Sequence, residues 1–527
     1  MGGPPVKTVV LLTAGVLCLV TGFVLRSGAQ SLPRTIRTGR VARRWRTERD
    51  RARFSTDGLF VAMPELSARN TLSTRQRDAF IAGGVALLIS VVIAPHLTVV
   101  FIVSVCTLGY AASMVVRLWL YVASLGGPEL VRLSDTEARS APDEVLRTYT
   151  VLVPVFREPE VMSSLVANLR RLDYPADRLQ ILLLVETDDS ATITSARWAI
   201  GPANDIRILL VPPGGPRTKP KALNYGLTHV TGTYITIFDA EDRPDPLQLR
   251  KAALAFSTQP ASVACLQARL GFFNGRQNLI TRWFQVEYSM WFRQMLPGLS
   301  KLGAPIPLGG TSNHFRTDVL LDLGAWDPNN VTEDADLGAR LSRAGYRSEV
   351  LDSVTLEEAN SDFVNWAKQR SRWYKGYLQT FLVHIRDIRS TRRAMGTREL
   401  LFFTFLVGGT PLMAMANPVF WILTVLWFSV KPAWIMTMYP APVYYVGLVV
   451  WLAGNFLFTF ISMLEAVEVD DSLFVAALLT PLYWVMMSVA AFKALIQVVF
   501  APTYWEKTRH GLAGPARVAA TPVRPAS

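Results

Sequence analysis

Tyr234–Phe238 (YITIF) runs directly into Asp239-Ala240-Glu241-Asp242, and this stretch decides the fold of the central part of the chain. A short, continuously apolar run with β-branched and aromatic residues predicts a strand that is buried on both faces. Three carboxylates at the end of such a strand repel one another, and a divalent cation relieves that repulsion. Carboxylate oxygens suit Mg²⁺ or Mn²⁺, with diphosphate oxygens completing the shell. The stretch therefore predicts a metal site, with a plain acidic turn as the alternative.

Three more apolar runs precede this strand, and helical patterns separate them. Tyr149–Phe156, Gln180–Val185 and Ile206–Val211 are predicted strands, while Val161–Leu172 and Lys221–Val230 have helical spacing. Strands that alternate with helices predict an α/β domain with a mostly parallel sheet covered on both faces. Ligands of such sheets bind at the carboxyl ends of the strands, where the acidic clusters fall.

The composition indicates a membrane protein. Half of the 527 residues are hydrophobic and 18% are charged, against about 25% charged residues in an ordinary soluble domain. The net charge of +13 comes from cations that lie next to apolar runs, which is typical of cytoplasmic loops. No nucleic-acid-binding motif accompanies the charge, so we expect no nucleic-acid partner. The three cysteines have no metal-ligand or redox spacing.

Residues 1–125 are predicted to form an N-terminal membrane region with about three transmembrane helices. Thr8–Leu25 is an uncharged run long enough to span a bilayer, and we favour a retained anchor over a signal peptide. Phe80–Ala94 and Leu97–Ala123 predict a helical hairpin divided at Pro95. Nine arginines between Arg34 and Arg53 place the intervening loop in the cytoplasm.

The remaining chain divides into a soluble domain, a second membrane region and a tail. Residues 126–398 are polar on average and have the size of one domain. Residues 399–506 are predicted to hold interfacial and transmembrane helices, and residues 507–527 to form a basic, flexible, cytoplasmic tail. An even number of crossings in the second membrane region keeps the domain and the tail on one side.

The second membrane region contains several apolar runs. Leu400–Ala416 and Val419–Val430 are separated by Asn417-Pro418, which predicts either a hairpin or one span followed by an interfacial helix. Val443–Leu464 and Leu473–Phe500 are long enough to cross. The acidic stretch Glu465–Asp471 between them favours the outer side of the membrane.

Two polar motifs follow predicted strands. Glu186-Thr187-Asp188-Asp189 places carboxylates at a strand end, where they could accept hydrogen bonds from a nucleoside, although a turn also favours Asp. Arg217-Thr218-Lys219-Pro220-Lys221 puts two lysines at a helix start, where the helix dipole adds to their charge. This second motif predicts a diphosphate site, with a solvated basic loop as the alternative.

Two further motifs lie nearer the end of the soluble domain. Thr332-Glu333-Asp334 precedes a helical pattern, so Asp334 is a candidate general base and Thr332 a candidate helix cap. Gln369, Arg372 and Trp373 share one helix face. Aromatic rings stack on sugars while Gln and Arg bind hydroxyls and phosphates, although an amphipathic helix lying on the membrane has the same pattern.

The order of these motifs resembles the membrane-bound family 2 glycosyltransferases, the superfamily of cellulose, hyaluronan, chitin and curdlan synthases. The resemblance covers about Thr148 to Gly376, where the family's D, DxD, TED and QxxRW motifs have counterparts in order. It implies a GT-A fold, which is Rossmann-like, and an inverting transfer from a nucleotide sugar.

The resemblance also implies a role for each motif. The resemblance implies that Asp188 or Asp189 binds the nucleoside diphosphate together with Lys219, with Lys221 beside it, and that Asp239 and Glu241 bind the metal. It implies that Asp334, next to Glu333, is the base and that Trp373 contacts the acceptor. Gln369 and Arg372 are implied to lie near the donor diphosphate. The family's DxD is D-A-E here, so either Glu241 or Asp242 completes the metal site.

We therefore expect a multi-pass enzyme of the cell membrane with a cytoplasmic transferase domain. It is expected to transfer a hexose from a nucleotide sugar, with UDP-hexose as the expected donor, to a growing β-linked polysaccharide. The synthesis is expected to be coupled to export of the polysaccharide, with possible accessory subunits. One alternative is transfer to a lipid carrier or membrane lipid. Another is a non-catalytic membrane scaffold or transporter with a degenerate transferase domain.

Overall fold

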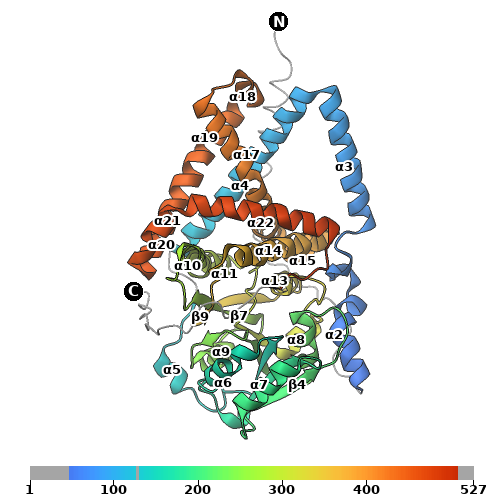
Figure 1. The fold of residues 1–527 in the computed structure, drawn as a ribbon, viewed down its shortest axis with the longest axis vertical. Coiled ribbons are helices and arrows are strands. Elements are labelled where there is room, and N and C mark those ends of the chain that lie inside the picture. The colour runs from blue at the N-terminus through green and yellow to red at the C-terminus, as the bar shows by residue number, and fades with distance from the viewer. Residues whose placement is uncertain (1–44, 46, 126–129, 508–527) are drawn as a thin grey trace.

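The computed structural model describes residues 45, 47–125 and 130–507. Figure 1 shows a sheet domain in the lower half and long helices above it, among them α3 (Thr74–Ile93), α4 (Pro95–Leu125) and α17 (Gly409–Ser429). The predicted anchor Thr8–Leu25, most of the arginine cluster and all but Lys507 of the predicted tail lie outside the described residues.

A single mixed sheet forms the centre of the lower domain. Within the described residues its strand order is β1-β9-β7-β8-β5-β2-β3-β4, with β6 paired to β9. These strands are β1 Leu130–Val131, β2 Tyr149–Val155, β3 Leu179–Glu186, β4 Ile206–Val211, β5 Tyr234–Ile237, β6 Arg243–Pro244, β7 Val263–Phe272, β8 Asn313–Arg316 and β9 Arg347–Glu357. Most neighbouring pairs are parallel, while β8 is antiparallel to both β5 and β7. The predicted mostly parallel α/β sheet is confirmed.

Both faces of the sheet are buried by helices, which explains why the strands β2, β3 and β5 are mostly apolar. One face packs against α6 (Met162–Leu169), α7 (Ser190–Ile200) and α9 (Gln248–Thr258). The other packs against α8 (Lys219–Leu227) and α13 (Glu333–Arg343), and the inner end of α4 joins this second core. The sheet domain and the long helices therefore share a hydrophobic core.

In the described part of the chain, five helical segments are long and apolar enough to cross a membrane. They are 68–93, 95–125, 397–429, 441–469 and 480–500. The predicted break at Asn417-Pro418 is wrong, because Pro418 lies inside continuous helix α17. A proline is tolerated within a membrane helix where neighbouring groups satisfy the freed carbonyl.

The acidic stretch Glu465–Asp471, which covers the end of α20 (Phe458–Val469) and the two residues after it, lies against the sheet domain, which corrects its predicted outer location. Asp470 pairs with Arg276, and Glu468 pairs with Arg293 at 2.9 Å. Both arginines belong to the sheet domain, so the carboxylates neutralise domain cations there.

The final apolar helix, α22 (Thr480–Phe500), packs along α14 (Phe363–His384). It runs across the direction of α3 and α17 in Figure 1. Segment 480–500, which is α22 itself, is long and apolar enough to cross a membrane, as are segments 397–429 and 441–469.

Candidate active site

One cavity of about 660 Å³ joins the carboxyl ends of the central strands to the apolar helices above them. Its lower walls carry Asp239, Glu241, Lys219 and Asp334, and its upper walls include residues of α4, α17 and α22. Residues predicted from three separate motifs therefore meet in one space.

The acidic turn after β5 divides its three carboxylates between two tasks. Asp239 and Glu241 line the cavity. Asp242 is buried and folds back, where it accepts hydrogen bonds from the Asp239 amide at 2.7 Å and from the Thr311 hydroxyl. Asp242 thus braces the turn, and Glu241 is the carboxylate presented beside Asp239.

Lys219 supplies a positive charge at the same place. Its ammonium donates to the Asp239 carboxylate and to the Gly310 carbonyl oxygen at 2.8 Å. Burial alone lowers the pKa of Lys219, but the carboxylates of Asp239 and Glu333 outweigh it and raise the pKa above its usual value. Lys219 therefore stays protonated within the cavity.

Lys221, the second lysine of the motif, points away from the cavity. It is 2% exposed and pairs with the buried Glu186 at 3.1 Å. It also donates to the carbonyl oxygens of Pro212 and Gly214 at 2.7 and 3.1 Å. These contacts fix the start of α8 against the end of β3, so Lys221 supports the loop that carries Lys219.

Asp188 and Asp189 lie at the entrance side rather than among the cavity-lining residues. Asp188 pairs with Arg217, which does line the cavity, at 2.8 Å. Asp189 caps α7, because its carboxylate accepts from the Thr192 amide at 3.3 Å, and it also accepts from the Arg157 amide at 2.5 Å. Arg217 is thus the member of this group closest to a ligand in the cavity.

Glu333 and Asp334 enter the cavity at the start of α13. Burial raises the pKa of Asp334 to about 6. Burial and the neighbouring Asp334 charge raise the pKa of Glu333 to about 8. Thr332 occupies the cap position, yet its side chain makes no capping hydrogen bond.

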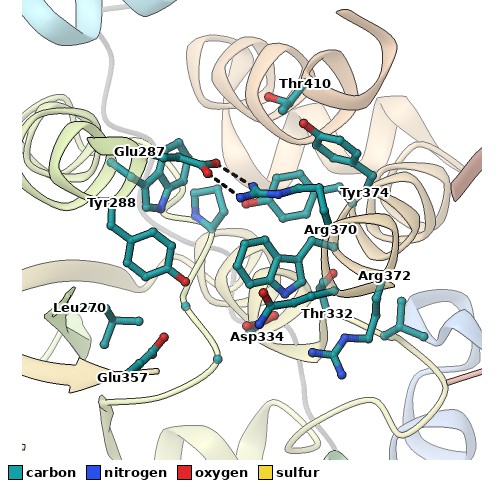
Figure 2. Close-up of a pocket in the computed structure, with 18 of the residues that line it drawn as sticks. Leu270, Glu287, Tyr288, Thr332, Asp334, Glu357, Arg370, Arg372, Tyr374 and Thr410 are labelled. Atoms are coloured by element: carbon teal, nitrogen blue, oxygen red, sulfur yellow. Dashed lines mark hydrogen bonds and ion pairs between the residues drawn. The ribbon is translucent and has the colours of Figure 1, made fainter. Parts of the chain in front are cut away.

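The predicted face of α14 lines the cavity opposite these carboxylates. Gln369, Arg372 and Trp373 all contribute to its wall, and Figure 2 shows Arg372 beside Thr332 and Asp334. Gln369 accepts a hydrogen bond from the Asn360 amide at 2.8 Å. The Arg372 guanidinium lies 5.1 Å from the centre of the Trp505 ring.

The segment that follows α22 covers this part of the cavity. Lys375 of α14 donates to the carbonyl oxygens of Ala501 and Tyr504, both at 2.7 Å. Lys507 donates to the Phe156 carbonyl oxygen at the end of β2. Trp505 is thereby held in the cavity wall, a role that its sequence position did not reveal.

A second unpredicted group joins the domain to α22. Arg370 forms a two-point ion pair with Glu287, with one contact at 2.7 Å, as the dashed lines in Figure 2 show. Tyr483 of α22 donates to Glu287 at 2.9 Å and accepts from Arg370 at 3.0 Å. The planar Arg guanidinium has five N–H donors and can form two parallel hydrogen bonds to one carboxylate, as Arg370 does with Glu287. Only the position of Arg370 inside the Gln369–Trp373 motif hinted at its importance.

Comparison with known proteins identifies the central domain. Residues 147–376 match the family model described as glycosyltransferase like family 2. This central part of the chain is therefore similar to the family 2 glycosyltransferases. The match begins at β2 and ends at Gly376 in α14, so it includes every candidate site residue named from the sequence.

The chain has relatives with different acceptors in their names. It is 28% identical over 304 residues to glucomannan 4-beta-mannosyltransferase 1 of Oryza sativa subsp. japonica, covering 54% of this chain and 58% of the relative. It is 27% identical over 254 residues to beta-monoglucosyldiacylglycerol synthase of Trichormus variabilis, covering 47% and 53%. The chain thus spans little more than half the length of these curated relatives.

Among solved structures, the chain is similar to the mannosyltransferase PcManGT from Pyrobaculum calidifontis, in complex with GDP-Man and Mn²⁺. The TM-score is 0.45 and the identity 20%, with 74% of this chain and 99% of that chain covered. The GT-A assignment of the sheet domain rests on the family match together with the mostly parallel sheet.

Proposed function

We propose that the chain is an inverting, metal-dependent glycosyltransferase that extends a β-linked glycan in the cavity between the sheet and the membrane helices. The observation that carries the proposal is the meeting of Lys219, Asp239, Glu241 and Asp334 in one cavity that continues among apolar helices. A water-soluble donor can enter at the strand ends, while an acceptor can extend toward the membrane.

The carboxylates fit a divalent cation. Burial raises the pKa of Glu357 well above its usual range, and the charges of Asp242 and Asp239 raise it further. Such repulsion indicates a deficit of positive charge, which Mg²⁺ or Mn²⁺ would relieve. No described group of three His, Cys, Asp or Glu side chains is arranged to hold an ion alone. Asp239 and Glu241 would therefore share the ion with diphosphate oxygens, and the ion would supply charge stabilisation for the leaving diphosphate.

Lys219 and Arg372 supply fixed cations for the donor. Both line the cavity, and both interact electrostatically with Asp239 and Glu333. A nucleoside diphosphate brings its own negative charges, so these cations would bind it and stabilise it as it leaves.

Asp334 would act as the general base. Its carboxylate would accept the proton of the acceptor hydroxyl as that oxygen attacks the anomeric carbon, and the bond to the diphosphate would break on the opposite side. One proton moves to Asp334 and one electron pair leaves with the nucleoside diphosphate. Attack from the opposite face turns an α-linked donor into a β-linkage.

The topology supports a cytoplasmic domain. The segments 397–429 and 441–469 form an even pair of crossings, and the acidic stretch after them returns to the domain. Nucleotide sugars are expected on the cytoplasmic side of the membrane, and the cavity leads from the sheet domain toward the membrane helices. This arrangement favours synthesis coupled to export of the glycan, alone or with accessory subunits.

Product analysis tests the proposal directly. Purified full-length protein is supplied with Mg²⁺ or Mn²⁺ and with each labelled UDP- or GDP-hexose in turn. We expect one donor to label a β-linked polymer of high molecular weight. Label confined to one added sugar would overturn elongation, and absence of label with every donor would overturn the transferase proposal itself.

A further inference from the structure

An arginine lies in the membrane part of the cavity without a carboxylate partner. Arg117 belongs to α4 and lines the cavity. Its guanidinium donates to the hydroxyl of Thr410 in α17 at 2.7 Å. Among the described residues, no Asp or Glu oxygen forms an ion pair with it, and it is only partly buried, so the cation is open to the cavity.

Two other ionisable side chains of these apolar helices have protein partners. Lys493 of α22 pairs with Glu506 at 2.8 Å, and Glu465 of α20 accepts from Gln294. A charged side chain inside a membrane span normally pairs in this way or marks the path of a ligand. Arg117 follows the second pattern, because Glu287, the carboxylate that interacts with it, is already engaged by Arg370.

The depth of Arg117 fits a lipid head group. Arg117 lies 22 residues after Pro95, the first residue of α4, by subtraction of their numbers. At about 1.5 Å per residue this is roughly 33 Å, close to the thickness of the hydrocarbon core. With Pro95 near one surface of the bilayer, Arg117 lies near the other surface, at the level where lipid phosphates reside on the domain side.

The same arm of the cavity has room for an apolar chain and leads to the candidate base. Met114, Met413, Phe458 and Met487 line it. Tyr377 of α14, Arg117 and Asp334 all line this one cavity. A molecule with a phosphate at Arg117 can therefore present a nearby hydroxyl toward Asp334.

We propose that Arg117 and Thr410 bind the phosphate group of a lipid-linked acceptor, whose sugar hydroxyl reaches Asp334 and whose lipid chain lies among α4, α17 and α22. This rests on the proposed function, because it names the class of acceptor that the same cavity takes. The growing glycan would be carried on a lipid phosphate.

Binding of a phosphorylated isoprenoid tests the site without requiring sugar transfer. Labelled farnesyl phosphate, farnesol and inorganic phosphate are titrated onto the purified full-length protein in detergent. We expect farnesyl phosphate to bind at least about tenfold more tightly than farnesol, since a charge-assisted hydrogen bond is lost with the phosphate. Arg117→Met should weaken farnesyl phosphate binding roughly ten- to hundredfold and leave farnesol binding unchanged.

Three further variants isolate the cause. Arg117→Lys keeps the charge but loses the forked geometry, so it should retain part of the affinity. Thr410→Val should weaken farnesyl phosphate binding a few-fold, and this variant provides the test if Arg117→Met fails to fold. Arg75→Gln removes an exposed arginine of α3 and should change nothing. Thermal unfolding and UDP binding report that each variant is folded.

Specific outcomes would overturn the proposal. Equal binding of farnesol and farnesyl phosphate would do so, as would unchanged farnesyl phosphate affinity in both Arg117→Met and Thr410→Val. Displacement by inorganic phosphate at equal concentration would assign a free-phosphate site instead of a lipid head-group site. If no donor yields a glycosylated product while the binding still depends on Arg117, the proposed function fails and the phosphate site stands.

Discussion

Gly376 of α14 lies directly against the side chain of Thr332. A methyl group built on Gly376 would come within 2.7 Å of the Thr332 Cβ and would overlap the rest of its side chain. This contact sets how closely the helix that carries Gln369 and Arg372 approaches the loop that carries Asp334.

Gly376→Ala is therefore expected to push α14 away from the loop. Overpacking of this kind costs about 1–3 kcal/mol of unfolding free energy. Turnover should fall because Arg372 and Asp334 move apart, while affinity for the nucleotide should change less. Calorimetry and initial rates measure both effects. Gly84→Ala in α3 is the matched control, since a methyl group there meets no atom within 4 Å.

The pKa of Asp334 predicts the pH dependence of the transfer. A base must be ionised to accept a proton, and burial raises the pKa of this carboxyl to about 6. The value of kcat/KM should thus rise as the pH is raised through about 6 and level off above it. Asp334→Asn should lower kcat by roughly 10²- to 10⁴-fold and keep UDP binding. Unchanged kcat in that variant would show that Asp334 is not the general base.

The three carboxylates of the acidic turn should differ in their roles, with Asp239 and Glu241 serving metal binding and Asp242 serving stability. Asp239→Asn and Glu241→Gln should raise the Mn²⁺ concentration needed for half-maximal activity, since both carboxylates line the cavity. Asp242→Asn should mainly lower the melting temperature, because that carboxylate braces the Asp239 amide and Thr311. A metal titration and a thermal melt of each variant separate the two roles. A larger shift in metal dependence for Asp242→Asn than for Glu241→Gln would reverse the assignment.

The two lysines of one motif should respond differently to replacement. Lys219→Met is expected to weaken UDP binding, because Lys219 is the cavity-lining member. Lys221→Met leaves the buried Glu186 without its partner and should lower the free energy of unfolding by about 3–5 kcal/mol. Adding Glu186→Gln to Lys221→Met should restore part of that loss. Additive losses in the double variant would show that the pair is not coupled.

The sheet could be anticipated where sequence and burial agree. The central strand Tyr149–Val155 was predicted to within one residue, because a strand that is buried on both faces is mostly apolar. The acidic turn at Asp239 was placed correctly at a strand end for the same reason. Strands β7 to β9 mix polar and apolar residues, so their bounds could not be predicted from the sequence pattern.

Contacts between distant segments could not be anticipated in this way. Arg370 and Glu287 are 83 positions apart, and neither position shows its partner in the local pattern. The acidic stretch Glu465–Asp471 was predicted to lie on the outer side of the membrane, because the charge of a residue does not show which groups it contacts. The pairing of its carboxylates with Arg276 and Arg293 became evident only in the folded chain.

The walls of the cavity come from widely separated parts of the chain, with α4 near one end and Trp505 near the other. During synthesis, the sheet and its carboxylates emerge from the ribosome before α17, α22 and Trp505 exist. The chemical groups are therefore assembled early, but the enclosure that shields them from water is completed last. In a chain that stops before α22, the site residues would be present but open to water. The order of synthesis therefore delays a working site until the membrane helices are in place.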